Sequence, residues 1–202
     1  KTNERTVHRH RHRHDPEDPD ARRSPVRGDL GDVRSFAPRK PVAGCMSLIL
    51  SSGGSMPQVG FGTWGIKARD VDLSVRAAVD AGYRLFDCAP VYKNEKAVGE
   101  TLAALIAERR LTRDAVFIAS KVPPADACDR QQLLATARQT LADLQTSFLD
   151  LYLVHWPFCV RNGSPTWPPP MSYQLGYNKQ QLRATWASME ELVSLGLVRA
   201  IG

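Results

Sequence analysis

Three ionisable residues stand directly after short apolar segments, and a tyrosine lies close behind the first of them. Asp87, Lys121 and His155 follow the segments, and Tyr92 comes five residues after Asp87. A phenol is a weak acid at neutral pH, and an ammonium group beside it favours its ionised form. A carboxylate keeps that ammonium charged and in place, and an imidazole can hydrogen-bond a carbonyl oxygen. These four residue types fit protonation of an oxygen while another group delivers hydride to the adjoining carbon.

Each of the four residues also has an ordinary structural explanation. Asp87 could cap a turn, and Tyr92 could pack in a loop. Lys121 could be a solvated strand end, and His155 could be a core histidine with one satisfied nitrogen. In α/β folds, however, active groups gather at the carboxyl ends of the parallel strands. Three of these residues at strand ends, with Tyr92 in the adjoining loop, therefore favour one catalytic site over four unrelated structural roles.

The apolar pattern predicts the elements that must position such a site. Strands are expected in a hairpin at 48–50 and 56–59, then at 59–64, 84–87, 116–119 and 151–154, with another beginning at 198. Helical spacing of apolar residues fills the intervals between these later strands. The second, third and fourth of them lie about 32 to 34 residues apart. Strands that alternate with helices at this spacing predict a parallel α/β fold.

The last helix has a recognisable beginning. Asn178 is expected to cap it, with Gln181 three residues later completing a capping box. Its expected core face consists of Leu182, Trp186, Met189 and Val193.

Periodicity alone does not separate a (β/α)8 barrel from a doubly wound sheet. The usual dinucleotide fingerprint GxGxxG is missing after the first predicted parallel strand, where the sequence reads Gly60-Phe61-Gly62-Thr63-Trp64-Gly65. This absence lowers the case for a doubly wound dinucleotide-binding domain.

Residues 1–45 have a different composition from residues 46–202, which are expected to form the folded domain. The segment alternates histidine and arginine at 8–14 and scatters prolines among charged residues, so we expect a disordered tail. Its histidines, His8, His10, His12 and His14, could bind a metal only weakly, and no other metal site is expected. Organelle targeting is disfavoured because the tail contains seven acidic residues.

Composition narrows the classes of partner and of cellular location. Of the net charge of +6, most comes from the tail, which leaves no basic face for a nucleic acid. No apolar run is long enough to predict a membrane span. The four cysteines, Cys45, Cys88, Cys128 and Cys159, have no paired spacing. We therefore expect reduced thiols and a cytoplasmic protein.

Several stretches together resemble the aldo-keto reductase family. They are Gly60–Trp64, Gly82–Ala89, Val91–Glu95, Phe117–Lys121, Asp150–Pro157 and Gly196–Gly202. The resemblance covers about residues 47–202, with matching spacing across four predicted strands.

The resemblance implies a (β/α)8 barrel that uses NADPH without a doubly wound domain, with only the first four to five β/α units present here. It implies that Tyr92 is the general acid and that Lys121 favours loss of its proton. Asp87 would be the partner of that lysine, and His155 would orient the substrate carbonyl.

The same resemblance implies which residues bind the ligands. Thr63, Trp64 and Asp87 would contact NADPH, and His155 and Trp156 would contact the substrate. The substrate would be a small-molecule aldehyde or ketone, and the full-length enzyme would be a monomer.

Two other expectations stay open beside an active reductase. The sequence stops in the predicted fifth parallel strand, before the family's contacts for the nicotinamide and the 2′-phosphate, so this chain could be an inactive fragment. It could also belong to a cofactor-binding regulatory subunit of the same family.

Overall fold

The structure is a computed structural model that describes residues 46–164, 168–176 and 178–202. The predicted disordered tail, with its four histidines and Cys45, lies outside the described residues.

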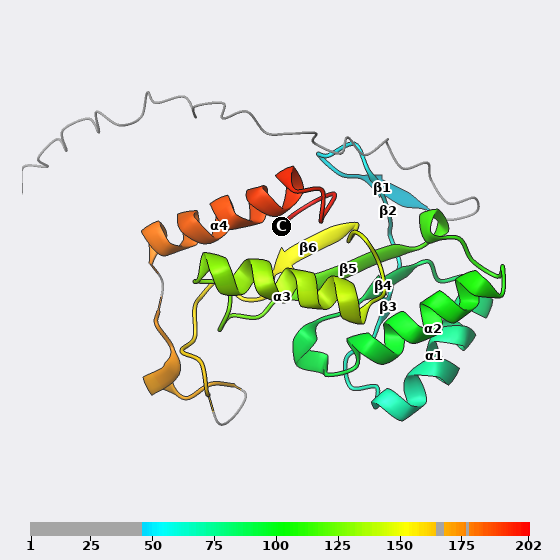
Figure 1. Cartoon of the computed structure of the whole chain (residues 1–202), viewed down its shortest axis with the longest axis horizontal. Helices are drawn as coiled ribbons and strands as arrows, with labels where there is room; N and C mark the ends of the chain where they lie inside the picture. The colour runs from blue at the N-terminus through cyan, green and yellow to red at the C-terminus, as the bar shows by residue number, and fades with distance from the viewer. Residues whose placement is uncertain (1–45, 165–167, 177) are drawn as a thin grey trace, which may run out of the picture. The chain divides into compact units, whose positions relative to one another are not determined.

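The described strands form two separate sheets (Figure 1). β1 (Ser47–Ile49) and β2 (Ser55–Pro57) pair antiparallel, which confirms the predicted hairpin. The second sheet is parallel and consists of β3 (Phe61–Gly62), β4 (Leu85–Asp87), β5 (Phe117–Val122) and β6 (Leu151–Val154). Its strand order, β3-β4-β5-β6, follows the chain. The predicted parallel α/β fold is therefore confirmed.

Helices connect the parallel strands. They are α1 (Val71–Asp80), α2 (Glu95–Ala107), α3 (Arg130–Asp143) and α4 (Lys179–Ser194), with short 3₁₀ helices η1 (Ala68–Asp70), η2 (Pro90–Tyr92), η3 (Arg113–Ala115) and η4 (Met171–Tyr173). Each α-helix packs against the next one along the chain. A doubly wound sheet reverses its strand order and covers both faces with helices. The sequential strands and the continuous row of helices have the winding of a (β/α)8 barrel instead.

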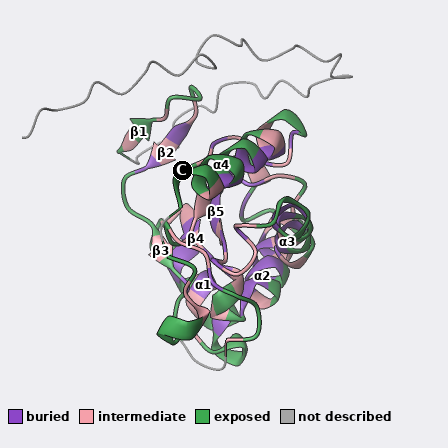
Figure 2. Ribbon diagram, turned by 90° about the vertical axis from the view of Figure 1, so that its left-hand side faces the viewer, coloured by how far each residue is buried: buried purple, intermediate pink, exposed green. Residues whose placement is uncertain are grey.

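The helices bury one face each against the sheet (Figure 2). Val71 and Val75 of α1, and Val98 and Leu105 of α2, have no exposed surface. These faces agree with the helical spacing of apolar residues in the sequence, because side chains three or four positions apart lie on the same side of a helix.

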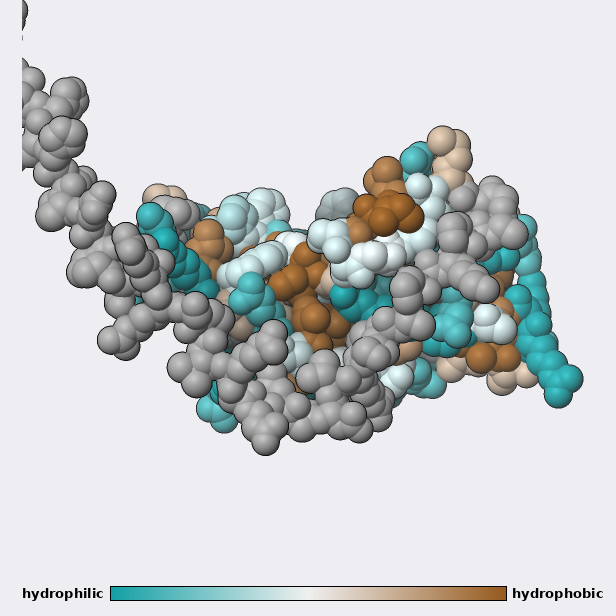
Figure 3. Space-filling view, turned by 90° about the horizontal axis from the view of Figure 1, so that it is seen from above, coloured by the Kyte–Doolittle hydropathy of each residue, from teal (hydrophilic) through white to brown (hydrophobic). Residues whose placement is uncertain are grey.

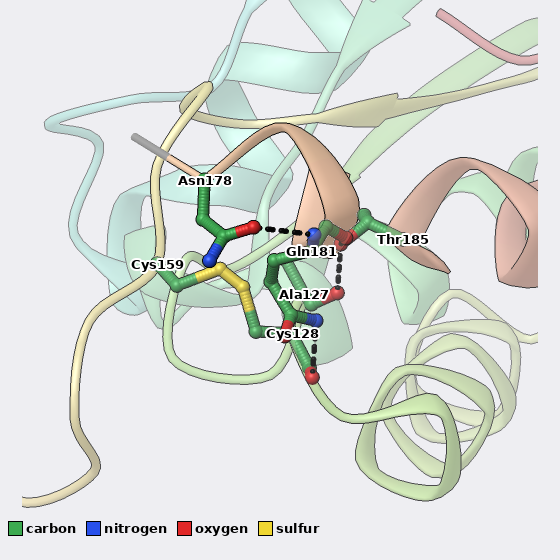
Figure 4. Close-up of a disulfide and its surroundings, with 6 residues drawn as sticks. All are labelled: Ala127, Cys128, Cys159, Asn178, Gln181 and Thr185. Carbon is green, nitrogen blue, oxygen red and sulfur yellow. Dashed lines mark hydrogen bonds between the residues drawn. A yellow bond between two sulfur atoms is a disulfide. The ribbon is translucent and has the colours of Figure 1, made fainter. Parts of the chain in front are cut away.

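The predicted capping box of α4 is only half formed. Asn178 Oδ1 accepts the backbone N–H of Gln181 at 3.0 Å, so the cap itself is confirmed. The side chain of Gln181 does not return to Asn178 but donates its Nε2–H to the carbonyl of Cys128 at 2.8 Å (Figure 4). This bond joins the first turn of α4 to the segment that precedes α3.

The predicted core face of α4 is wrong for two residues. Leu182 and Trp186 are exposed, whereas Thr185 and Ser188 are buried beside Met189. Thr185 can be buried because its hydroxyl donates to the carbonyl of Ala127 at 2.7 Å, which satisfies a group that is otherwise costly to desolvate.

Hydrophobic patches are visible among hydrophilic surface on the face shown in Figure 3.

The predicted fifth parallel strand is present only as isolated bridges. Val198 pairs in parallel with Leu149, and Ile201 with Tyr152. The segment therefore lies beside β6, where a further strand of the sheet would be.

The prediction of reduced cysteines is wrong for one pair. Cys128 and Cys159 form a disulfide across a sequence separation of 31 residues, with their Cα atoms 5.9 Å apart (Figure 4). The fold brings together the loop after β5 and the loop after β6, which spacing along the sequence does not reveal. Cys88 is the free cysteine of the described residues, and it is buried.

Two features are absent from the described part of the chain. None of its helices has the length and apolar character needed to cross a membrane. No group of three or more histidine, cysteine or acidic side chains there is arranged to hold a metal ion.

Candidate active site

The ammonium group of Lys121 is the centre of the site. Lys121 lies near the end of β5, and its Nζ donates to Asp87 Oδ1 at 2.7 Å and to Tyr92 Oη at 2.9 Å. A third bond goes to the carbonyl of Cys88 at 3.0 Å. An ammonium has three N–H donors, so all of them are used. The structure thus brings together three of the four residues singled out from the sequence.

Opposing influences act on the charge of Lys121. Burial, the largest of them, lowers the pKa, but the hydrogen bonds with Asp87 and Tyr92 outweigh it and raise the pKa of Lys121 above its ordinary value. The side chain therefore remains an ammonium at neutral pH, in direct contact with a phenolic oxygen.

His155 completes the group at the end of β6. Its ring meets the Tyr92 ring edge-on at 6.0 Å between centroids and stacks on Trp156 at 6.1 Å. Burial, followed by the positive charge of Lys121, lowers the pKa of His155, although Asp87 opposes the shift. The imidazole is consequently neutral at neutral pH and can donate one N–H.

The surroundings of the histidine ring favour one tautomer. Nδ1 is buried and has no hydrogen-bond partner among the described residues. A buried N–H without an acceptor costs more than a buried lone pair without a donor. The proton is therefore better placed on Nε2.

A cavity of about 820 Å³ opens beside these groups. Tyr92 and His155 line it together with Trp64 and Trp156. The remaining wall comes from the segment around η2 and from the loops after β5 and β6. Arg161, in the second of these loops, also lines the cavity, and no signal in the sequence pointed to it.

The residues expected to bind the cofactor lie at different depths. Trp64 is 78% exposed and borders the cavity. Thr63 is fully buried, and its hydroxyl donates to the carbonyl of Asp87 at 2.9 Å. In this arrangement the Thr63 side chain braces the end of β4, and its surface does not line the cavity.

Two groups at the site could hold a ribose and a planar ring such as those of NADPH. The Asp87 side chain is 39% exposed although one of its oxygens holds Lys121, so it can still accept a hydroxyl proton from a ribose. Trp64 adds an exposed aromatic surface beside the same cavity. A carboxylate acceptor and an aromatic wall are suitable for a ribose and a planar ring.

Two buried polar residues that support the site were missed from the sequence. Glu95 and Ser120 are 4% and 0% exposed, and they hydrogen-bond each other. A signal for Glu95 was available, because it lies three and seven positions before Val98 and Leu102 and so shares the apolar face of α2.

Comparison with known proteins shows the family of this chain. The model of the "Aldo/keto reductase family" matches residues 58–202. The chain belongs to this family. The aldo-keto reductase chain therefore has the fold class that its sequence predicted, the first β/α units of a parallel (β/α)8 barrel.

The curated relatives are longer than this aldo-keto reductase chain. Aldo-keto reductase family 1 member A1-A of Danio rerio is 40% identical over 162 residues, which are 77% of this chain and 48% of the relative. Aldo-keto reductase family 1 member A1 of Homo sapiens is 35% identical over 161 residues, with the same two shares. The chain thus spans about half the length of the curated relatives it matches.

Solved structures agree with the fold. An aldose reductase from Schistosoma japonicum superposes with a TM-score of 0.69 at 34% identity. The superposed part is 78% of this chain and 52% of the aldose reductase chain. An aldo-keto reductase from Bombyx mori in complex with NADP superposes with a TM-score of 0.67 at 29% identity, with shares of 78% and 50%.

Proposed function

We propose that this protein reduces aldehyde and ketone carbonyls of small molecules to alcohols, with Tyr92 as the general acid. The observation that carries the proposal is the Lys121 ammonium, which contacts both Asp87 and Tyr92 beside a cavity that His155 also lines. Charge on the lysine favours the phenolate that remains after Tyr92 gives up its proton.

His155 positions the substrate. Its neutral imidazole donates the Nε2 proton to the carbonyl oxygen, and this bond strengthens as negative charge develops there. Tyr92 Oη then transfers its proton to the same oxygen, and Asp87 holds Lys121 in place during the transfer. Trp156, stacked on His155, forms part of the wall that contacts the substrate.

NADPH would supply the hydride when bound. Asp87 and Trp64 would hold its nicotinamide end, and Thr63 would act indirectly by bracing the end of β4. The structure of the Bombyx mori aldo-keto reductase in complex with NADP supports this choice of cofactor.

Replacement of Tyr92 by phenylalanine tests the mechanism. The change is made in a polypeptide completed to the relatives' length, where it removes the acidic hydroxyl but keeps the ring. The rate constant for carbonyl reduction should then fall about 10²–10⁴-fold, the usual contribution of general acid catalysis. NADPH binding, followed by fluorescence, should be unchanged. Tyr83→Phe is the control, because Tyr83 packs against Phe61 and does not line the cavity.

The length of the chain supports a second proposal about where this activity resides. Because the chain covers only 48% of the zebrafish relative, we propose that the 202 residues alone are inactive and that a polypeptide completed to the relatives' length is active. NADPH consumption is measured with an aldehyde panel for this chain and for a chimaera that continues into the remainder of the zebrafish protein. Turnover by this chain alone would refute the second proposal, and a chimaera without turnover, or one indifferent to Tyr92→Phe, would refute the first.

A monomeric state, a cytoplasmic location and the absence of nucleic-acid and membrane partners stay predictions. The same holds for the boundary between a tail at 1–45 and a domain at 46–202.

A further inference from the structure

Tyr92 and Lys121 come from different elements. Tyr92 ends the short η2 helix, whereas Lys121 belongs to β5. The 2.9 Å contact between Tyr92 Oη and Lys121 Nζ therefore depends on how firmly the chain after η2 is attached to β5.

Glu95 supplies such an attachment. It is the first residue of α2, three positions after Tyr92, and is 4% exposed. Its Oε1 accepts the hydroxyl proton of Ser120 at 2.6 Å, and its Oε2 accepts that of Thr140 at 3.3 Å. Ser120 directly precedes Lys121 in β5. Because side chains alternate along a strand, Ser120 and Lys121 point to opposite faces of the sheet.

Asn94 fastens the same segment on its other side. Its side-chain Nδ2 donates to the carbonyls of Thr63 at 2.8 Å and Ile66 at 2.9 Å, and the residue is 2% exposed. Asn94 and Glu95, which follow the exposed Lys93 at the start of α2, are thus buried and bonded to elements on both sides. These bonds leave the Tyr92 turn little freedom to move.

We propose that Glu95 is a positioning residue, whose bond to Ser120 holds Tyr92 against Lys121. The inference rests on the function proposed above. A positioning role requires the hydrogen bond and not the charge, because a carboxylic acid, a carboxylate and an amide all present an oxygen that accepts a hydroxyl proton. Burial raises the pKa of Glu95 to about 7, so the group serves in both protonation states near neutral pH.

The ammonium protons of Lys121 give a readout that does not depend on turnover. They are donated to Asp87, Tyr92 and Cys88, and an ammonium held in this way exchanges its protons with water slowly. The exchange rate is measured on the 202-residue chain by ¹⁵N NMR of the lysine side chains. The Lys121 signal is assigned by its loss in Lys121→Arg, and Tyr92→Phe shows the effect of losing one acceptor.

Four variants test the proposal. Ser120→Ala and Glu95→Ala break the attachment, so the Lys121 exchange rate should rise about 3- to 10-fold, as the loss of one hydrogen bond allows. Glu95→Gln keeps an acceptor and should retain the wild-type rate. Thr101→Val is the matched control, because Thr101 is also buried in α2 but bonds only to Ala97 of its own helix.

The outcomes are distinct. If Glu95→Ala does not fold, as judged by circular dichroism, Ser120→Ala alone decides. An unchanged exchange rate in folded Ser120→Ala overturns the proposal, and so does an equal acceleration in Thr101→Val, which would indicate general loosening of α2. Acceleration in Glu95→Gln equal to that in Glu95→Ala would show that charge matters and would also overturn it. A chimaera without carbonyl reduction would refute the proposed function but leave these rates unaffected.

Discussion

The buried carboxyl of Glu95 should make the stability of this protein depend on pH. Burial, the largest influence, raises its pKa from 4.5 to about 7, although the hydrogen bonds from Ser120 and Thr140 oppose the shift. Between these two pH values the folded state binds more protons than the unfolded state. The free energy of unfolding that Glu95 contributes is therefore fully present below pH 4.5 and is lost as pH rises through about 7.

The size of this loss follows from the two pKa values. A rise from 4.5 to about 7 corresponds to roughly 3 kcal/mol, at 1.36 kcal/mol for each tenfold change in proton affinity. Replacement of Glu95 by glutamine removes the titration. The stability of Glu95→Gln relative to wild type should thus increase by roughly 3 kcal/mol between pH 4.5 and pH 8.

Urea denaturation at intervals of pH, followed by circular dichroism, measures this difference. His155 has a lowered pKa and changes stability in the opposite direction, but it is present in both proteins and cancels in the comparison. Thr101→Val should keep the wild-type pH profile. Parallel profiles for wild type and Glu95→Gln would refute the reasoning, since they would mean that the carboxyl is not held in a poorly solvated site.

Three further predictions concern the frame that holds the site. Gly99→Ala should destabilise the protein by about 2–3 kcal/mol, because the added methyl group would overlap backbone atoms at the end of α3. Gly62→Ala, where nothing lies within 4 Å, should be nearly neutral in the same denaturation assay. Cys159→Ser should cost about 3–4 kcal/mol by the chain-entropy estimate for a loop of this length, and the difference from wild type should vanish in a reducing buffer, which opens the Cys128–Cys159 bond. Asp150→Ala should cost about 3–5 kcal/mol, because the buried carboxylate accepts from Arg113 at 3.0 Å and from the backbone of Ile118 at 2.9 Å; a cost below about 1 kcal/mol, the level of an exposed pair, would contradict this.

Much of the fold was determined by the sequence itself. The apolar runs around β4, β5 and β6 and the helical spacing in α1, α2 and α3 predicted these elements because local periodicity reflects which face is buried. Asp87, Lys121 and His155, at or near strand ends, and Tyr92, in the segment after β4, also lie together in the structure. The carboxyl ends of parallel strands meet at one edge of a sheet.

The choice between barrel and doubly wound sheet needed either the family resemblance or the tertiary structure. Both folds share the same alternation of strands and helices, and they differ in strand order and in the faces that the helices cover. Neither property has a local signal in the sequence.

Polar contacts between distant segments were decided by the tertiary structure alone. Leu182 and Trp186 of α4 have the spacing of a core face, yet they are exposed, while Thr185 is buried against the carbonyl of Ala127. A helical pattern reports which residues share a face, but it does not report which neighbour that face meets or whether the neighbour offers a hydrogen-bond acceptor.

The same limit explains the disulfide and the attachment of the Tyr92 turn. Cys128 and Cys159 are 31 residues apart, and Glu95 and Ser120 are 25 residues apart. Each pair joins segments that become neighbours only after parallel strands have aligned. The sequence by itself determined which residues can act as acid, ammonium and imidazole, because residue type sets that chemistry. The tertiary structure decided which buried polar groups lie beside these side chains. That depends on distances of a few ångströms between segments far apart in the chain.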